Sequence, residues 1–229
     1  MARSRLLEAE LPTKDPHKLF DFWFNEVATD TSLEQASAVC VSTVSESVCD
    51  SNQLPDQLPS SRMVLLKGYN AEGFSFCTNY DSRKGQDLSS NPNAAMLFYW
   101  PQMNRQVRVE GVVERLPASE EEEYWLARPL ASQITGAASR QSSVIPSREY
   151  LEKKRVELEK EAEKNGADAI TKPENWGGFL LRPSYFEFWQ GQSDRLHDRI
   201  IFSKKAPKEG EDMVTKAESG YFMYRLAPP

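Results

Sequence analysis

The chain has 229 residues, of which 39% are hydrophobic and 27% are charged. This length and hydrophobic fraction are enough for a sizeable core in one large domain or two small ones. Its formal net charge of −6 argues against a general nucleic-acid-binding surface, because binding to a phosphate backbone requires clustered cations. The apolar runs are too short to span a membrane, and residues 1–10 lack the long apolar core of a secretory signal. We therefore expect a cytoplasmic protein that binds neither nucleic acid nor membrane, while the N-terminal segment leaves organelle targeting open.

The chain contains three cysteines, Cys40, Cys49 and Cys77, and only two histidines. The number of cysteines is odd and no pair has the spacing of metal ligands, so the pattern indicates neither a disulfide framework nor a zinc site. We expect reduced, mostly buried thiols and no bound metal.

Residues 1–14 are expected to form a flexible tail and residues 15–229 a single domain, because no break in composition divides the latter. Asp15 followed by Pro16 is a helix-start signal, with the carboxylate as N-cap and proline in the first helical position. The apolar side chains that follow recur at helical spacing and should face the core. They are Leu19, Phe20, Trp23 and Val27.

Short stretches rich in β-branched, aromatic or alternating apolar residues predict strands over most of the chain. They are 38–44, 62–67, 74–78, 94–100, 105–113, 178–181, 185–190, 199–202 and 221–226. Two polar stretches without hydrophobic period, 45–61 and 203–220, predict long surface loops.

Helices are predicted between some of these strands. The polar segment 79–92 should contain a short helix at 85–88. Ser119 and Glu122 form a capping-box pattern that starts a helix ending near Pro129. A charged helix should run from 146 to 164, mostly facing solvent because its apolar stripe is thin.

Strands and helices do not alternate regularly along the chain, so a doubly wound parallel sheet is disfavoured. An antiparallel β-barrel with peripheral helices fits the order of elements better. The predicted class is therefore mainly β, an α+β barrel of one domain.

One short segment concentrates unusual chemistry: Arg195, His197 and Arg199 alternate with Leu196 and Asp198. If the segment is extended, the two arginines and the histidine share one face. Two fixed cations beside a titratable imidazole suit an anionic substrate that needs orientation or proton transfer. The alternative, a solvated charged edge of a strand, fits this segment alone equally well.

Further hydroxyl, amide and cationic side chains cluster at predicted strand ends, in patterns that suit phosphate oxygens. These clusters are Arg62 with Lys67; Thr78, Ser82, Arg83 and Lys84; Gln106 with Arg108; Arg128, Ser132 and Gln133; and Gln141, Ser142 and Ser143. The chain has neither a P-loop nor a G-x-G-x-x-G turn, so it does not bind nucleotides in those ways. Together the clusters favour a phosphorylated ligand without specifying a reaction.

A series of segments, taken in order from about Asp15 to the C-terminus, resembles the pyridoxine (pyridoxamine) 5′-phosphate oxidase family. They are 62–68 (RMVLLKG), 78–85, 97–100, 104–111 (NRQVRVEG), 132–134, 141–146, 176–178, 187–191, 195–199 (RLHDR) and 225–228. The resemblance implies an FMN-binding split β-barrel of the antiparallel Greek-key type that forms a homodimer with FMN at the subunit interface. It implies oxidation of pyridoxine 5′-phosphate or pyridoxamine 5′-phosphate to pyridoxal 5′-phosphate, with O2 as acceptor, H2O2 as product and ammonia released from the amine.

The resemblance also assigns roles to residues of this chain. It places Arg62, Met63, Val64, Leu65, Leu66, Lys67, Cys77, Thr78, Arg83, Lys84, Gln106, Gln141, Ser142, Trp189 and Arg199 around FMN. It places Lys67, Tyr124, Arg128, Ser132, Arg195, Leu196 and His197 around the substrate. Arg195 and His197 would be the catalytic pair, with His197 either assisting proton transfer or only positioning the substrate.

This sequence departs from the usual pattern of the family at several positions. Leu126 and Ala127 replace polar residues, Asp194 precedes the Arg-Leu-His triplet, and Cys77 stands where an aromatic residue is more common. These departures motivate a second hypothesis, a catalytically impaired module that binds flavin or pyridoxal phosphate. A third hypothesis is a flavin reductase that uses a nicotinamide donor.

Overall fold

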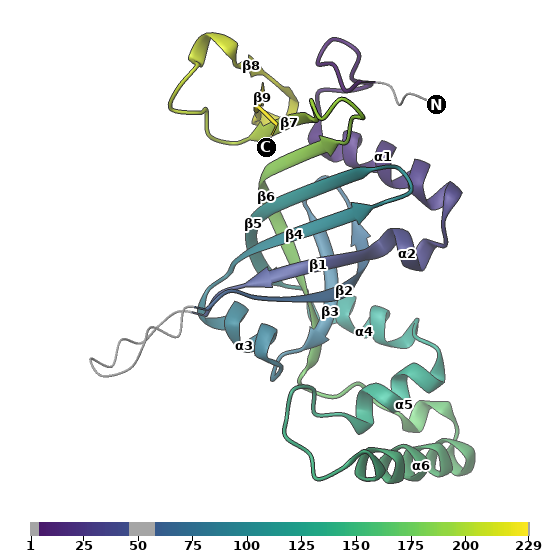
Figure 1. The fold of residues 1–229 in the computed structure, drawn as a ribbon. Helices are drawn as coiled ribbons and strands as arrows, with labels where there is room; N and C mark the ends of the chain where they lie inside the picture. The colour runs from purple at the N-terminus through teal and green to yellow at the C-terminus, as the bar shows by residue number, and fades with distance from the viewer. Residues whose placement is uncertain (1–4, 46–57, 229) are drawn as a thin grey trace.

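The computed structural model describes residues 5–45 and 58–228, and its nine strands form one antiparallel sheet that curls into a barrel (Figure 1). The strands are β1 (Ala38–Thr43), β2 (Ser60–Tyr69), β3 (Phe74–Asn79), β4 (Asn93–Trp100), β5 (Arg105–Arg115), β6 (Trp176–Gln190), β7 (Asp198–Ser203), β8 (Thr215–Lys216) and β9 (Phe222–Arg225). Their order is β3-β2-β1-β4-β5-β6-β7-β9-β8, and an additional pairing of β3 with β6 closes a barrel of six strands. Spatial order β4-β1-β2-β3 is that of a Greek key. The predicted antiparallel barrel with peripheral helices is confirmed.

The prediction of separate strands at 178–181 and 185–190 was wrong, because β6 runs through both as a single strand of 15 residues. Pro183, between the two predicted strands, lies where the register between β5 and β6 shifts after Glu110. A proline is tolerated at such a bulge because the ladder hydrogen bond is already lost there. Gly111 permits the close approach, since a Cβ at that position would collide with the carbonyl of Arg182.

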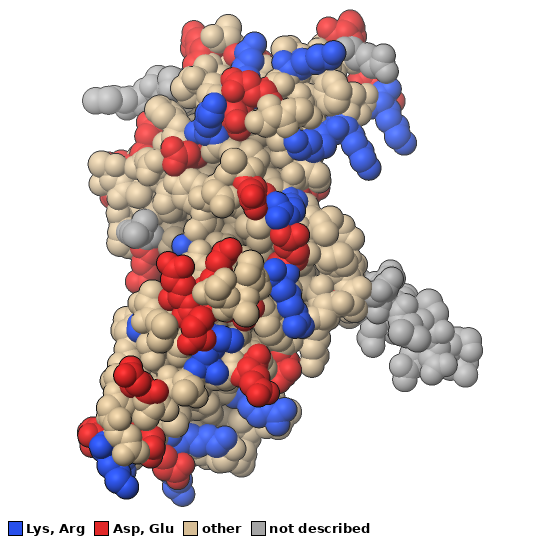
Figure 2. Space-filling view, turned by 180° about the vertical axis from the view of Figure 1, so that it is seen from behind, with Lys and Arg blue, Asp and Glu red and all other residues tan. Residues whose placement is uncertain are grey.

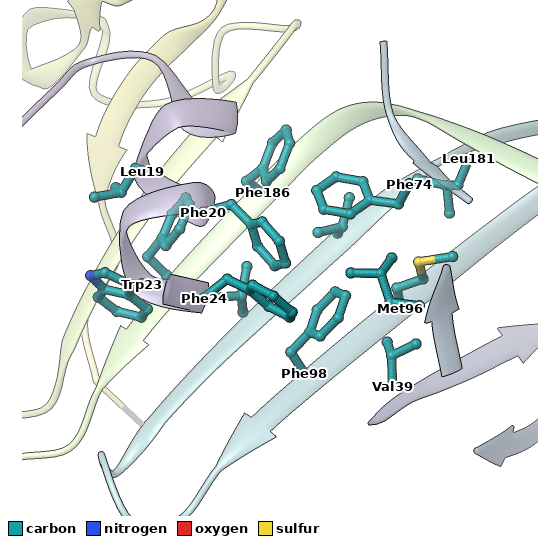
Figure 3. Close-up of a cluster of buried hydrophobic side chains, with 14 of the residues drawn as sticks. Leu19, Phe20, Trp23, Phe24, Val39, Phe74, Met96, Phe98, Leu181 and Phe186 are labelled. Atoms are coloured by element: carbon teal, nitrogen blue, oxygen red, sulfur yellow. The ribbon is translucent and has the colours of Figure 1, made fainter. Parts of the chain in front are cut away.

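Helix α1 (Pro16–Asp30) covers one end of the barrel, and its apolar face packs into the main core (Figure 3). Its N-terminus is capped as predicted, since the Asp15 carboxylate accepts a hydrogen bond of 2.9 Å from the backbone amide of His17. The ring of Phe20 meets the rings of Phe74 and Phe98 edge-on, at centroid distances of 4.8 and 4.9 Å. Burial of each such aromatic side chain contributes about 2–3 kcal/mol, so the predicted stripe anchors α1 to the barrel.

The remaining helices are α2 (Leu33–Ser37), α3 (Arg83–Ser90), α4 (Ala118–Leu126), α5 (Leu130–Ala138) and α6 (Arg148–Asn165). Helices α4, α5 and α6 gather below the barrel around a smaller core that includes Trp125, Ile134 and Trp176 (Figure 1). The sequence did not predict α5, and it placed α3 only at 85–88. The predicted capping box was wrong, because α4 begins at Ala118 after Pro117 and has no side-chain cap.

Several segments that connect these elements complete the description. The predicted loop 45–61 lies largely outside the described residues, as does Cys49. The predicted loop 203–220 contains β8 and two short 3-10 turns. Within the described ranges, none of the helices has both the length and the apolarity needed to cross a membrane.

The described part of the surface carries both charge signs. On the face shown in Figure 2, Lys and Arg side chains are interspersed with Asp and Glu side chains. Some of them form i,i+4 pairs along α6, such as Arg148 with Glu152 and Arg155 with Glu159.

Candidate functional site

The first group of predicted site residues, called here the cationic cluster, comprises Arg62, Thr78, Ser82, Arg83 and Lys84. Ser82 caps α3 by accepting a hydrogen bond from the amide of Gly85, which places Arg83 and Lys84 in the first turn of the helix. The Lys84 ammonium lies 3.1 Å from the Thr78 hydroxyl and 3.4 Å from the Ser82 hydroxyl. Because a helix N-terminus also carries partial positive charge, this corner of the barrel suits an anion.

The charges of the cationic cluster are only partly balanced by protein groups. Burial, with the Arg62 charge adding to it, lowers the pKa of Lys84. Burial also lowers the pKa of Arg62, and the Asp87 carboxylate opposes that effect from 3.8 Å. Asp87 is itself buried and accepts a hydrogen bond of 2.6 Å from the Thr43 hydroxyl. Two desolvated cations thus lie close together, and the Asp87 carboxylate pairs with Arg62, an arrangement that favours binding of a phosphate.

Gln141 joins the cationic cluster from the loop before α6. Its side-chain oxygen accepts hydrogen bonds from the Thr78 hydroxyl at 3.2 Å and from the Asn79 amide at 3.3 Å. Ser142 follows with a left-handed φ of 69°, so the loop turns sharply beside β3. The structure therefore brings these two predicted residues to the same corner as Thr78.

A second group, called here the helical cluster, comprises Lys67, Cys77, Tyr124, Arg128 and Ser132. Helix α4 presents Tyr124, whose hydroxyl lies 3.2 Å from the Ser75 hydroxyl on β3. The Arg128 guanidinium donates a 2.8 Å hydrogen bond to the backbone carbonyl of Ser132 at the start of α5. Residues from β2, β3, α4 and α5 thus meet at one side of the barrel.

Two observations indicate that the helical cluster is built for an anion. The Nε atom of Arg128 is buried and has no hydrogen-bond partner among the described residues, although the guanidinium lies over the Trp176 ring at 5.2 Å. Burial raises the pKa of the Cys77 thiol to about 11, against the opposing charges of Lys67 and Arg128. The thiol is therefore neutral and does not compensate either cation, so an anionic ligand would satisfy the orphan donor.

A third group, called here the outer-face cluster, comprises Gln106, Trp189, His197 and Arg199. Gln106 on β5 pairs with Trp189 on β6, and Trp189 pairs with Arg199 on β7. The His197 ring lies against the Trp189 ring at a centroid distance of 5.0 Å. The pairing register therefore places an aromatic surface between an amide and a guanidinium.

Sequence reasoning gave no role to Glu187, which holds the arginines of the outer face. Its carboxylate accepts one hydrogen bond from Arg199 Nε and another from Arg108 Nη2, both at 2.6 Å. Burial opposes the ionised carboxylate, but the two arginines outweigh it and lower the pKa of Glu187. Arg199 also donates a 3.0 Å hydrogen bond to the backbone carbonyl of Ala227. The alternation of polar residues on β6 was the sequence signal that could have pointed to Glu187.

The expectation that Arg195, His197 and Arg199 share one strand face was wrong, because β7 begins only at Asp198. Arg195 lies in a turn with a left-handed φ of 65°. The cause is local, since the Asp194 carboxylate accepts a 3.0 Å hydrogen bond from the Leu196 amide, as in an Asx turn. Arg195 and Leu196 are exposed, whereas His197 is half-buried.

The remaining predicted residues divide between the two faces of β2. Met63 and Leu65 point outward and are 63% and 39% exposed, whereas Leu66 is buried and Val64 packs against the core. Only the backbone of Val64 and Leu66 is therefore available to a ligand. Leu126 and Ala127 on the helical side are exposed, so these departures from the family pattern point into solvent.

The three clusters do not form one site within a single chain. Strands β1 and β4 separate β2 from β5, a distance of three strand spacings or about 14 Å along the sheet. The intervening outer surface is apolar and open, with Leu97 37% and Tyr99 56% exposed. The structure thus brings the predicted residues together in two halves, the cationic and helical clusters on one side and the outer-face cluster on the other.

Comparison with known proteins points to a single family. Residues 26–160 match the family model described as pyridoxamine 5′-phosphate oxidase, and residues 176–228 match the pyridoxine 5′-phosphate oxidase C-terminal dimerisation region. A Caenorhabditis elegans protein whose name places it among pyridoxamine 5′-phosphate oxidases is 58% identical, over 87% of this chain and 85% of its own. The pyridoxine-5′-phosphate oxidase of Bos taurus is 45% identical over 96% of this chain and 81% of its own. Among solved structures, PhzG from Burkholderia lata 383 in complex with tetrahydrophenazine-1-carboxylic acid superimposes with a TM-score of 0.82 at 25% identity, covering 99% of each chain.

Proposed function

Because the chain belongs to the pyridoxine/pyridoxamine 5′-phosphate oxidase family, we propose that it is an FMN-dependent oxidase that forms pyridoxal 5′-phosphate from pyridoxine 5′-phosphate and pyridoxamine 5′-phosphate. The observation that carries this proposal is the presence of two anion-ready clusters along β2 and β3, one with under-compensated cations and one with the orphan Arg128 Nε. A flavin phosphate and a substrate phosphate are two such anions. Cys77 of the helical cluster and Thr78 of the cationic cluster are consecutive residues of β3, so the two clusters occupy neighbouring parts of the barrel.

The cationic cluster would hold the FMN phosphate through Arg62, Arg83, Lys84 and the Thr78 hydroxyl. Met63, Leu65, Gln106, Trp189 and Arg199 would contact the flavin ring, with Gln141 and Ser142 closing over the phosphate end. When bound, FMN supplies a two-electron acceptor that O2 regenerates with release of hydrogen peroxide. The guanidinium of Arg199, held by Glu187, would place a positive charge beside the flavin ring.

The helical cluster would hold the substrate phosphate through Lys67, Tyr124, Arg128 and Ser132. Binding a phosphate remote from the reacting carbon fixes that carbon against the flavin, so binding energy is used for orientation. Arg195, Leu196 and His197 would approach the other face of the substrate ring. Oxidation of the alcohol gives the aldehyde directly, whereas the amine gives an imine that water hydrolyses to the aldehyde and ammonia.

A homodimer would unite the two halves of the site. Packing the apolar outer face of β2, β1 and β4 on a second copy would bury Met63, Leu65, Leu97 and Tyr99, which are exposed in the isolated chain. In a two-fold interface each surface contacts its equivalent reciprocally, so the outer-face cluster of one chain can meet the cationic cluster of its partner twice. The matched C-terminal dimerisation region, which includes β6, β7 and β9, is consistent with this role.

The proposal is tested by giving the purified, FMN-loaded protein pyridoxine 5′-phosphate in air and measuring hydrogen peroxide and pyridoxal 5′-phosphate. We expect the two products in equal amounts. In the same assay Arg195→Leu should lose most turnover while its flavin stays bound, because Arg195 would face the substrate. Bound flavin without peroxide from the unsubstituted protein would contradict an oxidase, and full turnover by Arg195→Leu would contradict the role of that residue.

A further inference from the structure

The loop that joins β6 to β7 fixes the orientation of the His197 ring. Its Nδ1 atom lies 3.0 Å from the backbone nitrogen of Gln192. A backbone amide can only donate a hydrogen bond, so Nδ1 of His197 must be the acceptor. A neutral imidazole carries one proton, and here that proton is on Nε2.

We propose that Gln192 locks neutral His197 as the Nε2–H tautomer, so that the imidazole donates a hydrogen bond to the bound substrate and does not take a proton from it. In this tautomer the lone pair of Nδ1 is occupied by the Gln192 amide and the Nε2 position holds a proton. No ring nitrogen is free to act as a base. Of the two roles that the sequence left open for His197, this tautomer allows positioning of the substrate and not abstraction of a proton. That the ligand is the oxidase substrate rests on the proposed function.

The side chain of Gln192 makes the loop itself rigid, which makes Gln192 a positioning residue. Its amide nitrogen donates a 2.7 Å hydrogen bond to the carboxylate of Asp198, the first residue of β7. Asp198 is buried, and it also accepts hydrogen bonds from the Leu6 amide at 3.0 Å and from Arg225 at 2.6 Å. The residue whose backbone amide contacts the imidazole is therefore tied to the start of β7 and, through Arg225, to β9.

The other histidine of the chain provides an internal contrast. His17 Nδ1 lies 3.2 Å from the backbone carbonyl oxygen of Asn70. A carbonyl oxygen can only accept, so neutral His17 carries its proton on Nδ1. The two histidines should therefore occupy opposite neutral tautomers in the same molecule.

Nitrogen-15 NMR of protein labelled at histidine tests the tautomers directly, because the protonated and unprotonated ring nitrogens have well-separated shifts. His17→Gln assigns the two ring systems, and no substrate is required. In the FMN-loaded protein, we expect the uncharged imidazole of His197 to be the Nε2–H form and that of His17 to be the Nδ1–H form. An Nδ1–H form of His197, or an averaged mixture of the two forms, would overturn the inference.

Paired substitutions test the donor role. In His197→Gln the side-chain amide nitrogen stands near the position of Nε2 and keeps a donor, whereas His197→Phe keeps a ring and loses it. We expect His197→Phe to lower kcat/KM by about 100-fold or more and His197→Gln by about tenfold, as for removal or weakening of one positioned donor. Equal losses in the two variants, at equal flavin content, would refute donation. If the unsubstituted protein forms no pyridoxal 5′-phosphate, the proposed function fails, while the NMR result still decides the tautomer.

Discussion

Replacing Glu187 by Gln should destabilise the fold by far more than an ordinary surface substitution. The Glu187 side chain is 10% exposed and accepts one hydrogen bond from each of two arginines, both at 2.6 Å. A hydrogen bond to a charged group contributes about 1.5–3 kcal/mol, so the pair contributes about 3–6 kcal/mol. A glutamine amide keeps one acceptor but turns its NH2 group toward the second guanidinium. We therefore expect Glu187→Gln to lower the free energy of unfolding by about 2–3 kcal/mol.

The assay is urea denaturation of the FMN-free protein at one fixed protein concentration, because flavin and subunit association would both shift the apparent stability. Glu110→Gln is the matched control, since Glu110 pairs with the same Arg108 but is 42% exposed. An exposed ion pair contributes at most about 1 kcal/mol. A loss below about 1 kcal/mol for both variants would refute the reasoning, because Glu187 would then behave as a surface charge.

Three further substitutions test other parts of the molecule. Arg62→Gln should raise the Kd for FMN by about tenfold or more in a fluorescence titration, because one charge-assisted phosphate contact is lost. An unchanged Kd would show that Arg62 does not bind the FMN phosphate. Leu97→Glu should dissociate the dimer in sedimentation experiments, whereas Val156→Glu, at a similarly exposed position on α6, should not; two dimeric variants would exclude the β4 face from the interface. Burial lowers the pKa of His17, with Asp15 and the Asn70 carbonyl opposing it, so the folded state binds this proton less readily than the unfolded state. The stability due to neutral His17 is present above about pH 6.5 and is lost as the pH falls through its lower folded-state pKa. In urea titrations at a series of pH values, the free energy of unfolding should fall less on acidification for His17→Gln than for the unsubstituted protein. Identical pH profiles of the two proteins would contradict this.

Elements with a strong hydrophobic period were predictable from the sequence. The stripe that includes Phe20 and Trp23 on α1 is buried as expected, and most strands lie where alternation placed them. Elements set by local polar contacts were not. The turn at Arg195 depends on the Asp194 carboxylate, and the continuity of β6 through Pro183 depends on a bulge against β5. Neither contact has a periodic signature in the sequence.

The sequence named candidate residues for the site but gave no indication of how they are arranged. Sequence motifs named both Lys84, in the cationic cluster, and Arg199, in the outer-face cluster. Only the strand order shows that β1 and β4 lie between these two clusters. Motif spacing along a chain contains no information about which half a second copy would supply in the proposed dimer. The supporting role of Glu187 was likewise hidden, because it depends on which side chains β5 and β7 place beside it.

The pairing of β3 with β6 has a consequence for the behaviour of the protein at high concentration. Strand β3 would otherwise end the sheet, and its unpaired amides and carbonyls could recruit a strand from another molecule. Closure leaves β8, with two residues, as the only described strand that has a neighbour on one side alone. A two-residue edge is too short to template a cross-β stack, so the barrel is protected against edge-to-edge aggregation while its apolar outer face remains free for specific assembly.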